Sequence, residues 1–377
     1  MTIQKSILFL SFCLLPWYGF SQGTSENTTD TLSSSPVYKK VNMAFYPAIS
    51  YTPETSLQLG AIGFFVFNKP PTDSGSRFNR PSSFSPVVIY SLKNQFEIYT
   101  DWDIWNRKGW NYTIKAGFRN FPNVFYGLGN RTFSKDKEEY TEERLKIEAD
   151  LVKPLTEQLF VGLNLNLEHN HLYGFAQDGQ IESTSLIGKE GGLIWGIGPV
   201  LRLDTRDDVL YPTKGSRLDV KILYYPKELG SSYRFATYVV DFRKYLTIQN
   251  EKNVLAFQGV LNASSGNDIP FYKLWWIGGG YRLRGIENVN RYLDKQAMYV
   301  QAEYRRKLFW RLGGVVFTGA GEVSDRLNGF RLSEWKYVYG MGLRFQPIKG
   351  QNMNIRFDYG MGKGDQSGFY VLVREAF

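Results

Sequence analysis

The sequence predicts an all-β protein, a transmembrane antiparallel β-barrel of 16 strands, and three observations support this prediction. Apolar and polar residues alternate along most of the chain, aromatic residues make up 16% of its 377 residues, and an export signal stands at its front. A hydrophobic content of 43% with 21% charged residues excludes an intrinsically disordered chain. No apolar run reaches the ~18–20 residues that a membrane-spanning helix requires.

The front of the chain predicts export. Residues 1–21 carry the positive start, short apolar core and small-residue end of a secretory signal peptide. Residues 22–42 are rich in Ser and Thr without an apolar period, and we expect a short disordered periplasmic leader there. Cys13, the only cysteine, lies in the signal, so the exported chain is expected to have no disulfide. The remainder, 43–377, has one uniform pattern and is expected to form a single barrel domain.

The alternation has the form expected of a membrane barrel. In 159–168 the odd positions are Leu or Val, whereas the even ones include Asn164, Asn166 and Glu168. The same period of two recurs in 352–361, and it gives each strand one apolar and one polar face. The polar faces carry charged residues in mid-strand and the apolar faces end in aromatic residues. This pattern is typical of a lipid-facing band with aromatic girdles around a polar lumen.

Sixteen such segments can be placed along the chain. They lie near 43–51, 57–67, 84–92, 95–105, 110–118, 140–153, 158–168, 193–204, 216–226, 233–246, 254–263, 296–307, 311–321, 335–346, 352–361 and 368–377. An even number of strands places both ends of the barrel domain on the periplasmic side. The connections at 119–139, 169–191, 264–295 and 322–334 then become outer loops.

The charge balance indicates which surfaces the protein meets. Lys and Arg number 45 against 36 Asp and Glu, a formal net charge of +9. In an exported chain this surplus predicts contacts with outer-membrane lipid and lipopolysaccharide, and no nucleic acid partner.

A polar motif follows the eighth predicted strand. It contains Asp204, Arg206, Asp207, Pro212 and Gly215, residue types that form turns, at a predicted periplasmic connection. A calcium site is the alternative, but the motif lacks the alternating acidic ligands and the closing Glu of a calcium loop. We therefore expect a turn, and neither a metal nor a cofactor.

A glycine-rich run marks the longest predicted outer loop. Three glycines precede Arg282, Arg284 and Gly285. A phosphate-binding loop is not supported, because no Lys-Ser/Thr follows and no strand–helix frame surrounds the run. We expect a loop that turns sharply and enters the lumen, where an arginine needs acidic partners because an unpaired buried charge is costly.

These two motifs, with 355–360 and a terminal Phe377, resemble the BamA/TamA outer-membrane assembly family, also called the bacterial surface antigen family. The resemblance implies a 16-stranded barrel in the bacterial outer membrane, with an inward-folded sixth extracellular loop and weak closure between the first and last strands. It also implies a role in the insertion, export or scaffolding of outer-membrane or surface proteins. Arg284 matches the family's loop arginine, and Glu303 matches the acidic lumen residue on the following strand.

The sequence departs from the family pattern in two places. Gly319 stands where the family has an aspartate, so Asp358 is expected to pair with Arg284 in its stead, because it lies on a polar strand face as Glu303 does. The leader is too short for the family's periplasmic domains, and we therefore expect separate periplasmic or surface partner proteins. For the seam between first and last strands, Pro47 and Gly368 predict few hydrogen bonds.

Other functions are weighed on specific residues. A passive outer-membrane channel for small solutes through the polar lumen is the main alternative. A hydrolase would need His169 or His171 with Ser183 or Ser185, and two such histidines could also offer metal ligands. Neither arrangement has a placed carboxylate to orient it, so the protein is not expected to be an enzyme.

Overall fold

The structure is a computed structural model that describes residues 41–67, 81–106, 108–286, 288–347, 353–364 and 366–377. The predicted signal peptide and the leader up to residue 40 lie outside the described residues, as does most of the connection at 68–83. The described residues all belong to one compact unit, Lys39–Phe377.

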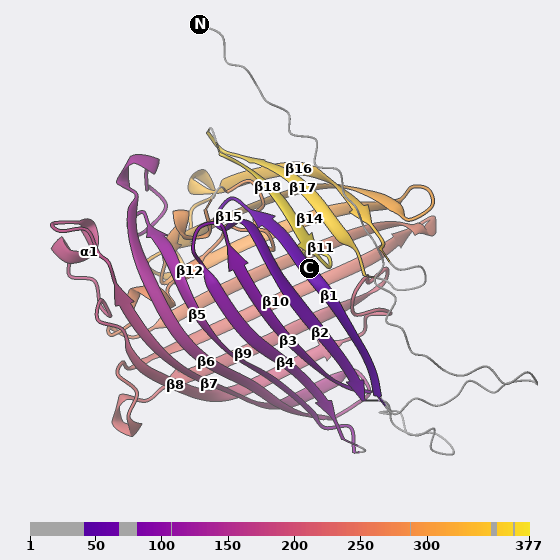
Figure 1. The fold of residues 1–377 in the computed structure, drawn as a ribbon, viewed down its shortest axis with the longest axis horizontal. Coiled ribbons are helices and arrows are strands. Elements are labelled where there is room, and N and C mark those ends of the chain that lie inside the picture. Colours follow the sequence, from indigo (N-terminus) through magenta and orange to yellow (C-terminus); the bar gives the residue numbers. More distant parts are fainter. Residues whose placement is uncertain (1–40, 68–80, 107, 287, 348–352, 365) are drawn as a thin grey trace, which may run out of the picture. The chain divides into compact units, whose positions relative to one another are not determined.

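Within these residues, sixteen antiparallel strands close into a barrel (Figure 1). Each strand pairs with its neighbours in the chain, except that β14 pairs with β11 and β18 pairs with β1. The strands are β1 (Val41–Thr52), β2 (Ser56–Phe67), β3 (Ser82–Ser91), β4 (Phe96–Trp105), β5 (Asn111–Phe125), β6 (Glu138–Pro154), β7 (Leu159–Tyr173), β8 (Gly192–Asp204), β9 (Gly215–Tyr225), β10 (Phe235–Ile248), β11 (Asn250–Ser265), β14 (Gln296–Lys307), β15 (Leu312–Ser324), β16 (Lys336–Phe345), β17 (Ile355–Gly362) and β18 (Ser367–Val373).

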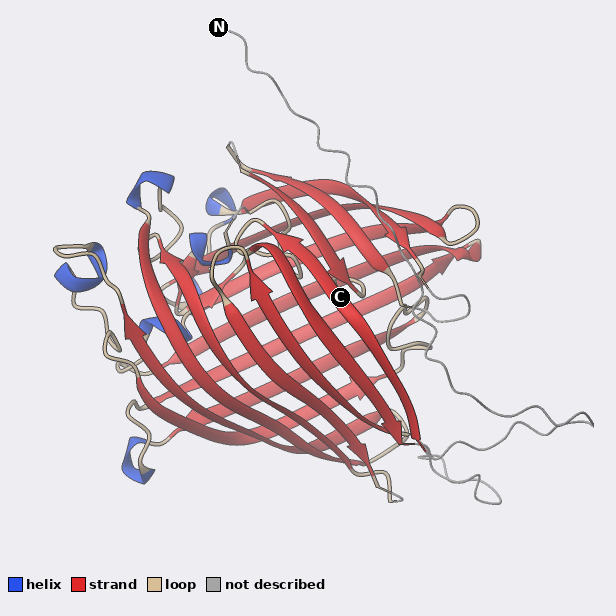
Figure 2. Cartoon of the chain, viewed as in Figure 1, coloured by secondary structure: helices blue, strands red, loops and turns tan. Residues whose placement is uncertain are grey.

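Short helical segments gather at one end of the barrel (Figure 2). They are α1 (Gln180–Ser183), η1 (Ser134–Asp136), η2 (Lys227–Leu229), η3 (Phe271–Lys273), η4 (Val289–Arg291), η5 (Leu327–Gly329) and η6 (Leu332–Glu334). The two-residue strands β12 (Trp275–Trp276) and β13 (Leu293–Asp294) pair with each other in the connection between β11 and β14. Outer-membrane barrels have short periplasmic turns and longer extracellular loops. The end with the helical segments is therefore the extracellular one.

The predicted fold class is confirmed, and each of the sixteen predicted segments coincides with a barrel strand. Many boundaries differ, most of all at β5 and β7, which run to Phe125 and Tyr173 where the predicted segments end at residues 118 and 168. The two ends of the barrel domain differ as well. β1 begins at Val41, two residues before the predicted barrel domain. β18 ends at Val373 and not at residue 377, because the chain turns at Arg374, where φ is +70°.

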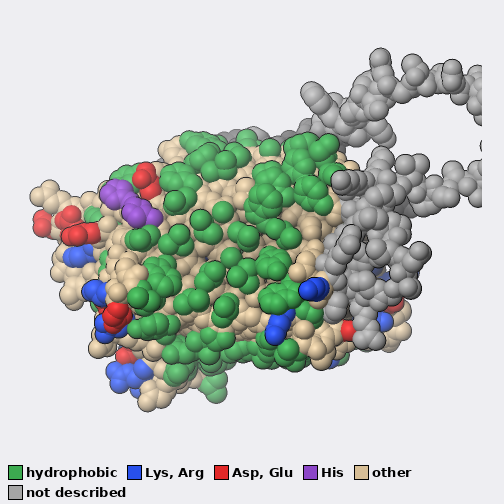
Figure 3. Space-filling model, turned by 90° about the horizontal axis from the view of Figure 1, so that it is seen from below, with side chains coloured by type: hydrophobic (Ala, Val, Ile, Leu, Met, Phe, Trp, Pro, Cys, Tyr) green, Lys and Arg blue, Asp and Glu red, His purple; other side chains and the backbone are tan. Residues whose placement is uncertain are grey.

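Along the barrel wall, apolar side chains are exposed on the outside and polar side chains are buried inside, the reverse of a water-soluble protein. In β7, Leu163, Leu165 and Leu167 are exposed, whereas Asn164 and Glu168 are buried. Figure 3 shows hydrophobic side chains over the middle of the barrel wall, with charged side chains towards its ends. The apolar face of each strand therefore meets the surroundings, and the polar face meets the lumen, as expected for a barrel in lipid.

No helix among the described residues is long and apolar enough to cross a membrane.

The connection at 266–295, here called the inner loop, packs against the lumen wall. Ile277, Leu283 and Ile286 are buried in one cluster with wall residues that include Val260 and Tyr299. The described part of this loop is thus fixed to the barrel wall by a shared apolar cluster, which holds the adjoining Arg284 in place.

Candidate functional site

Arg284 of the inner loop is fully buried among groups from three wall strands. Its Nη1 lies 2.7 Å from Oδ2 of Asp358 on β17, and its Nη2 donates to Oε1 of Glu303 on β14. Its Cζ lies 3.7 Å from the ring centroid of Phe317 on β15. The structure thus brings together the three charged residues that the sequence singled out, here called the loop lock: Arg284, Glu303 and Asp358.

The loop lock belongs to a larger buried ionic network. Asp358 also accepts from Nη1 of Arg344 at 2.5 Å and from Nη1 of Arg356 at 2.7 Å. The other oxygen of Glu303 accepts from Nε of Arg305 at 2.7 Å. A buried charge is tolerated only when it is paired and hydrogen-bonded. These additional pairs therefore make it possible to keep two carboxylates and a guanidinium inside the lumen.

Sequence reasoning missed Arg305, Arg344 and Arg356 as members of this network. The period of two was the available signal, because Arg305 and Arg356 each stand two residues from an acid of the loop lock. Residues two apart in a strand share a face, so both arginines could have been placed in the lumen. The meeting of Arg344 with Asp358 depends on the pairing of β16 with β17 and could not be read from one strand.

The backbone of the inner loop lies directly against β17. Gly285 has φ of +120°, and a Cβ on it would come within 2.7 Å of the carbonyl carbon of Met361. A Cβ on Gly360 would come within 2.6 Å of the carbonyl carbon of Arg284. The hydroxyl of Tyr370 on β18 accepts from the N–H of Gly285 at 3.3 Å. Glycine is required at both contacts because only a residue without a side chain allows this approach.

Arg282 does not join the loop lock. Its guanidinium stacks on Trp276, with Cζ 4.2 Å from the ring centroid, and Nη1 donates to the carbonyl of the same residue. Tyr299 on β14 is the second aromatic neighbour, at 5.9 Å. Burial, which is the largest effect, lowers the pKa of Arg282. Arg282 therefore stabilises the turn of the inner loop by stacking on Trp276 and does not pair with an acidic residue.

The glycine at 319, a departure from the family pattern, has a steric explanation. A Cβ on Gly319 would come within 2.7 Å of Cδ2 of Leu283, which is fully buried beside Arg284. Glu322 on the same strand binds elsewhere, accepting from the side chain of Asn130 at 3.0 Å and from the N–H of Arg331 at 2.8 Å. The space that an aspartate would fill is therefore taken by a leucine, and β17 supplies the second acid.

The polar motif after β8 forms a hydrogen-bonded turn. Arg206 holds Asp204 in a bidentate pair, with distances of 2.9 and 2.8 Å. Asp207 accepts from the N–H groups of Thr213 and Lys214 at 2.9 and 3.2 Å. Burial opposes ionisation of Asp207, but these bonds and the Thr213 hydroxyl outweigh it and lower the pKa of the carboxyl group. The carboxylates of this turn therefore bind backbone N–H groups and the guanidinium of Arg206, and so stabilise the turn.

The geometry of the same turn accounts for the other two residues of the motif, Pro212 and Gly215. Pro212 is buried at the turn, and Gly215 has φ of +100° with the carbonyl oxygen of Thr205 where a Cβ would stand. A left-handed backbone against a carbonyl accepts only glycine without strain.

The seam between β1 and β18 is short. Within the described residues the two strands share one register pair, Tyr51 with Val371, whereas β1 pairs with β2 along its whole length. Continuing the seam register places Pro47 opposite Glu375, beyond the end of β18. The early end of β18, and not the missing N–H of Pro47, therefore leaves the edge of β1 open.

Gly368 has a different role from the one the sequence suggested. A Cβ on it would come within 2.7 Å of Cζ of Tyr370, the residue whose hydroxyl contacts the inner loop. Gly368 therefore provides room for that ring.

Phe377 lies inside the barrel and not at the end of a strand. It is buried with Ala376 in a cluster with Tyr245 and Ala256, and its ring centroid lies 6.5 Å from that of Tyr245. Glu375, which precedes this pair, accepts from Nε of Arg344 at 2.8 Å. The reversal at Arg374 thus turns the last residues into the lumen, where they bind the ionic network.

The two histidines lie on β7 and not in the loop that follows it. His169 and His171 are exposed on the outward face, and the His171 ring stacks on Tyr173 at 5.4 Å. In the part of the chain that the structure describes, no group of three or more His, Cys, Asp or Glu could hold a metal ion.

Comparison with known proteins places this geometry in a family context. The Omp85 superfamily domain matches residues 90–373, about three-quarters of the chain. No curated protein sequence matches the chain.

Several solved structures share the fold. BamA from Haemophilus ducreyi lacking POTRA domains 1–3 has a TM-score of 0.61 and 13% identity, over 89% of this chain and 70% of that one. CdiB from Acinetobacter baumannii has a TM-score of 0.55 and 14% identity, over 89% and 60%. CdiB from Escherichia coli has a TM-score of 0.56 and 11% identity, over 90% and 64%. The chain thus spans less than two-thirds of either CdiB chain.

Proposed function

The chain belongs to the Omp85 superfamily of the bacterial outer membrane, and from this premise we propose that it inserts, exports or scaffolds outer-membrane or surface proteins by capturing a client strand at the β1–β18 seam. This is an assembly role and not an enzymatic one. Barrels of this superfamily serve outer-membrane protein insertion and secretion together with protein partners. We expect this chain to act with separate periplasmic or surface partners.

The open edge of β1 is the observation that carries the proposal. β1 runs from Val41 to Thr52, but it pairs with β18 only at Tyr51 within the described residues. An unpaired strand edge presents N–H and C=O groups that can bind another strand. In a lipid environment these groups have no water to satisfy them, so a client strand gains main-chain hydrogen bonds by adding there.

The loop lock supplies a fixed wall beside this edge. Gly285 and Tyr370 join the inner loop to β17 and β18, the strands on the far side of the seam. A client strand would then bind to the open edge of β1 on one side, while the strands on the other side are held by a buried ionic network. The proposal assigns a positioning role to Arg284, Glu303 and Asp358.

The passive channel receives less support from the same structure. Leu283 and Ile286 are buried against the lumen wall, and Phe377 occupies the lumen from the other direction. Planar-bilayer conductance that persists after deletion of residues 273–290 would support the channel instead.

Photocrosslinking at the open edge tests the proposal. A photoreactive phenylalanine analogue at Phe45 of β1, whose side chain is 71% exposed, should yield adducts with outer-membrane or surface proteins in intact cells. The matched control is the same analogue at Phe242 of β10, an exposed position within a fully paired strand. Equal adducts at both positions, or none at Phe45 in a folded barrel, would overturn strand capture.

A further inference from the structure

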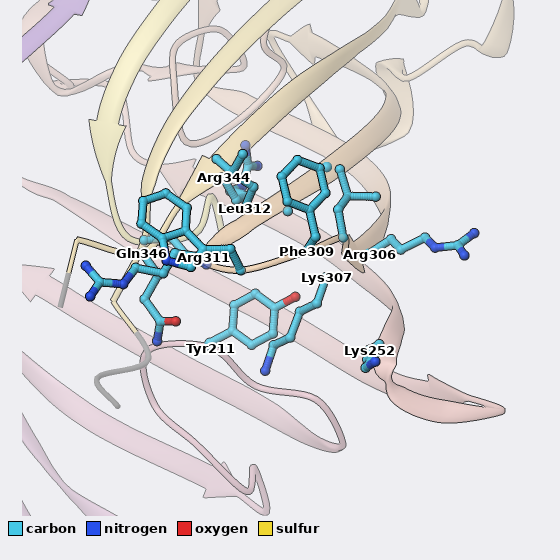
Figure 4. A pocket seen from close by; sticks show the side chains of 14 residues that line it. Tyr211, Lys252, Arg306, Lys307, Phe309, Arg311, Leu312, Arg344 and Gln346 are labelled. Carbon is cyan, nitrogen blue, oxygen red and sulfur yellow. The ribbon is translucent and has the colours of Figure 1, made fainter. Parts of the chain in front are cut away.

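The basic side chains of the barrel differ in how they are arranged. Around the periplasmic turn from β14 to β15, Arg306, Lys307 and Arg311 point in different directions, so they cannot bind one anion together (Figure 4). Arg144 on β6 is placed differently. The next residue, Leu145, is exposed on the outward face, so Arg144 points into the lumen.

The register of the barrel places three polar side chains in one row across the lumen wall. Arg144 is the register partner of Arg119 on β5 and of Asn170 on β7. Side chains that are directly opposite have Cβ atoms ~4.5–5.5 Å apart, and like charges in such a pair destabilise the sheet. The two neighbouring arginines therefore require negative charge close to them.

The acidic residues nearby neutralise only part of this charge. Arg119 donates to Glu142 through Nη2. The next lumen-facing acid, Glu168 on β7, is paired with Lys273 at 3.0 Å and with Lys146 at 3.6 Å. Arg144 has neither a hydrogen bond nor an ion pair with any residue that the structure describes. Its N–H donors are therefore free to bind a ligand.

Asn170 adds a second unsatisfied group to the row. It is 1% exposed, and neither its amide nitrogen nor its carbonyl oxygen has a hydrogen-bond partner among the described residues. Leaving such a donor and acceptor unpaired inside a protein costs free energy. A group bound by Arg144 would lie beside Asn170 and could satisfy it.

The row is open to the solvated part of the lumen. The side chains of Lys146 and Glu148, the next lumen-facing residues of β6 towards the periplasm, are 27% and 32% exposed. Towards the extracellular end, Tyr140, Leu172 and Phe271 are buried together in an apolar cluster. Arg144 thus lies where a solvated space ends against a closed one.

We propose that Arg144 and Asn170 bind a carboxylate group inside the lumen. The planar guanidinium matches the two oxygens of a carboxylate, and one of these oxygens can also accept from the Asn170 amide. A carboxylate balances the single charge of Arg144, whereas a phosphate dianion would be repelled by Glu142 and Glu168. The carboxylate belongs either to a small acid or to an Asp or Glu residue of a polypeptide. The inference is independent of strand capture at the seam.

Fluorine NMR of fluoroacetate with the detergent-purified full chain tests the site. The unaltered chain should broaden the fluoroacetate line, and acetate should reverse the broadening. We expect the affinity to be at least ~10-fold weaker in Arg144→Gln, because a charge-assisted contact is lost. Asn170→Leu, which keeps the size of the side chain but removes its amide, should weaken binding ~5-fold, the effect of one neutral hydrogen bond. Because Arg144→Gln also removes the like-charge pair, this variant should retain the heat-induced gel shift of a folded barrel.

The matched control is Arg243→Gln on β10. Arg243 also faces the lumen, but its Nε and Nη2 donate to Asp241 at 3.1 and 2.6 Å. Fluoroacetate should therefore bind this variant as it binds the unaltered chain. Unchanged binding in Arg144→Gln, an equal loss in Arg243→Gln, or displacement by chloride or phosphate as effective as displacement by acetate would overturn the proposal.

Competition distinguishes the two sources of the carboxylate. Acetate and N-acetyl-aspartic acid N-methylamide carry the same charged group, but the second also offers the peptide N–H and C=O that can pair with Asn170. Stronger competition by the aspartate derivative, lost in Asn170→Leu, would assign the site to acidic residues of a polypeptide. Equal competition by the two compounds in the unaltered chain would assign it to a small acid. Both results support a carboxylate site.

Discussion

Arg305 joins the loop lock to the end of the chain that borders the seam. Its Nη2 lies 3.0 Å from the carbonyl oxygen of Phe377, while its Nε donates to Glu303, the partner of Arg284. Two ion pairs and one hydrogen bond thus connect the inner loop to the segment after β18. A change in one of them can therefore alter the other without any contact across the lumen.

Replacing Arg284 by alanine should release the inner loop. Glu303 and Asp358 would lose their shared cation inside the lumen, and breaking a buried pair costs ~3–5 kcal/mol. We expect proteases to cut within 266–295 in the folded variant, and the heat-induced gel shift of the barrel to occur at a lower temperature.

The matched control is Arg326→Ala, which breaks an exposed pair with Asp325 on an outer loop. Exposed pairs contribute ~0–1 kcal/mol, so this variant should behave as the unaltered chain does. A protected loop in Arg284→Ala would contradict the positioning role of Arg284.

Gly285→Ala should loosen the loop for a steric reason. The new Cβ would meet the backbone of Met361 at 2.7 Å, in addition to the strain of a left-handed conformation. Strain of that conformation costs ~1–3 kcal/mol. Gly230→Ala is the matched control, because Gly230 has φ of +95° but no atom within 4 Å of a Cβ. A larger loss of loop protection in Gly285→Ala, measured by hydrogen exchange, would show the effect of close packing beyond strain.

The inner loop should become less stable as the pH rises past about 6. Burial raises the pKa of Asp294 on β13 to about 6. The folded loop therefore favours the neutral carboxyl group, so the contribution is complete below the ordinary pKa near 4 and is lost as the pH rises through about 6. Asp325 adds to this upward shift, whereas Lys295 opposes it.

Asp294→Asn should remove this dependence, because the amide stays neutral. Hydrogen exchange of 275–294, corrected for the intrinsic effect of pH, should show ~1–2 kcal/mol less protection at pH 8 than at pH 5 in the unaltered chain. The difference should vanish in Asp294→Asn and remain in Asp268→Asn, a change in the same loop. A difference that persists in Asp294→Asn would assign the pH effect to another group.

A disulfide across the seam should stop strand capture and leave the barrel folded. Tyr51 and Val371 are register partners, so cysteines at both positions can be joined, and the only native cysteine lies in the predicted signal peptide. Adducts from the photoreactive residue at Phe45 should disappear on oxidation and return on reduction. The same cysteines at Leu59 and Tyr90, register partners between β2 and β3, should have no effect. Unchanged adducts in the fully oxidised seam variant would exclude a working seam.

The alternation of residue types was enough to predict the sixteen strands and, in segments such as 159–168 and 352–361, which face of the strand meets the lumen. This was possible because alternation is local: lipid on one face and a polar lumen on the other select residue types two positions apart. The same local rule placed Glu303 and Asp358 inside the barrel, and the glycine-rich run marked the loop that carries Arg284.

The contacts between these parts could not be predicted from local patterns and are seen only in the folded barrel. The contact of Arg344 with Asp358 follows from the pairing of β16 with β17, and the room for Leu283 follows from Gly319 on another strand. The reversal at Arg374 ends β18 early, opens the edge of β1 and carries Phe377 into the lumen. These outcomes depend on the register and closure of the whole barrel. Residues far apart in the chain become neighbours only when the strands pair and the first strand meets the last.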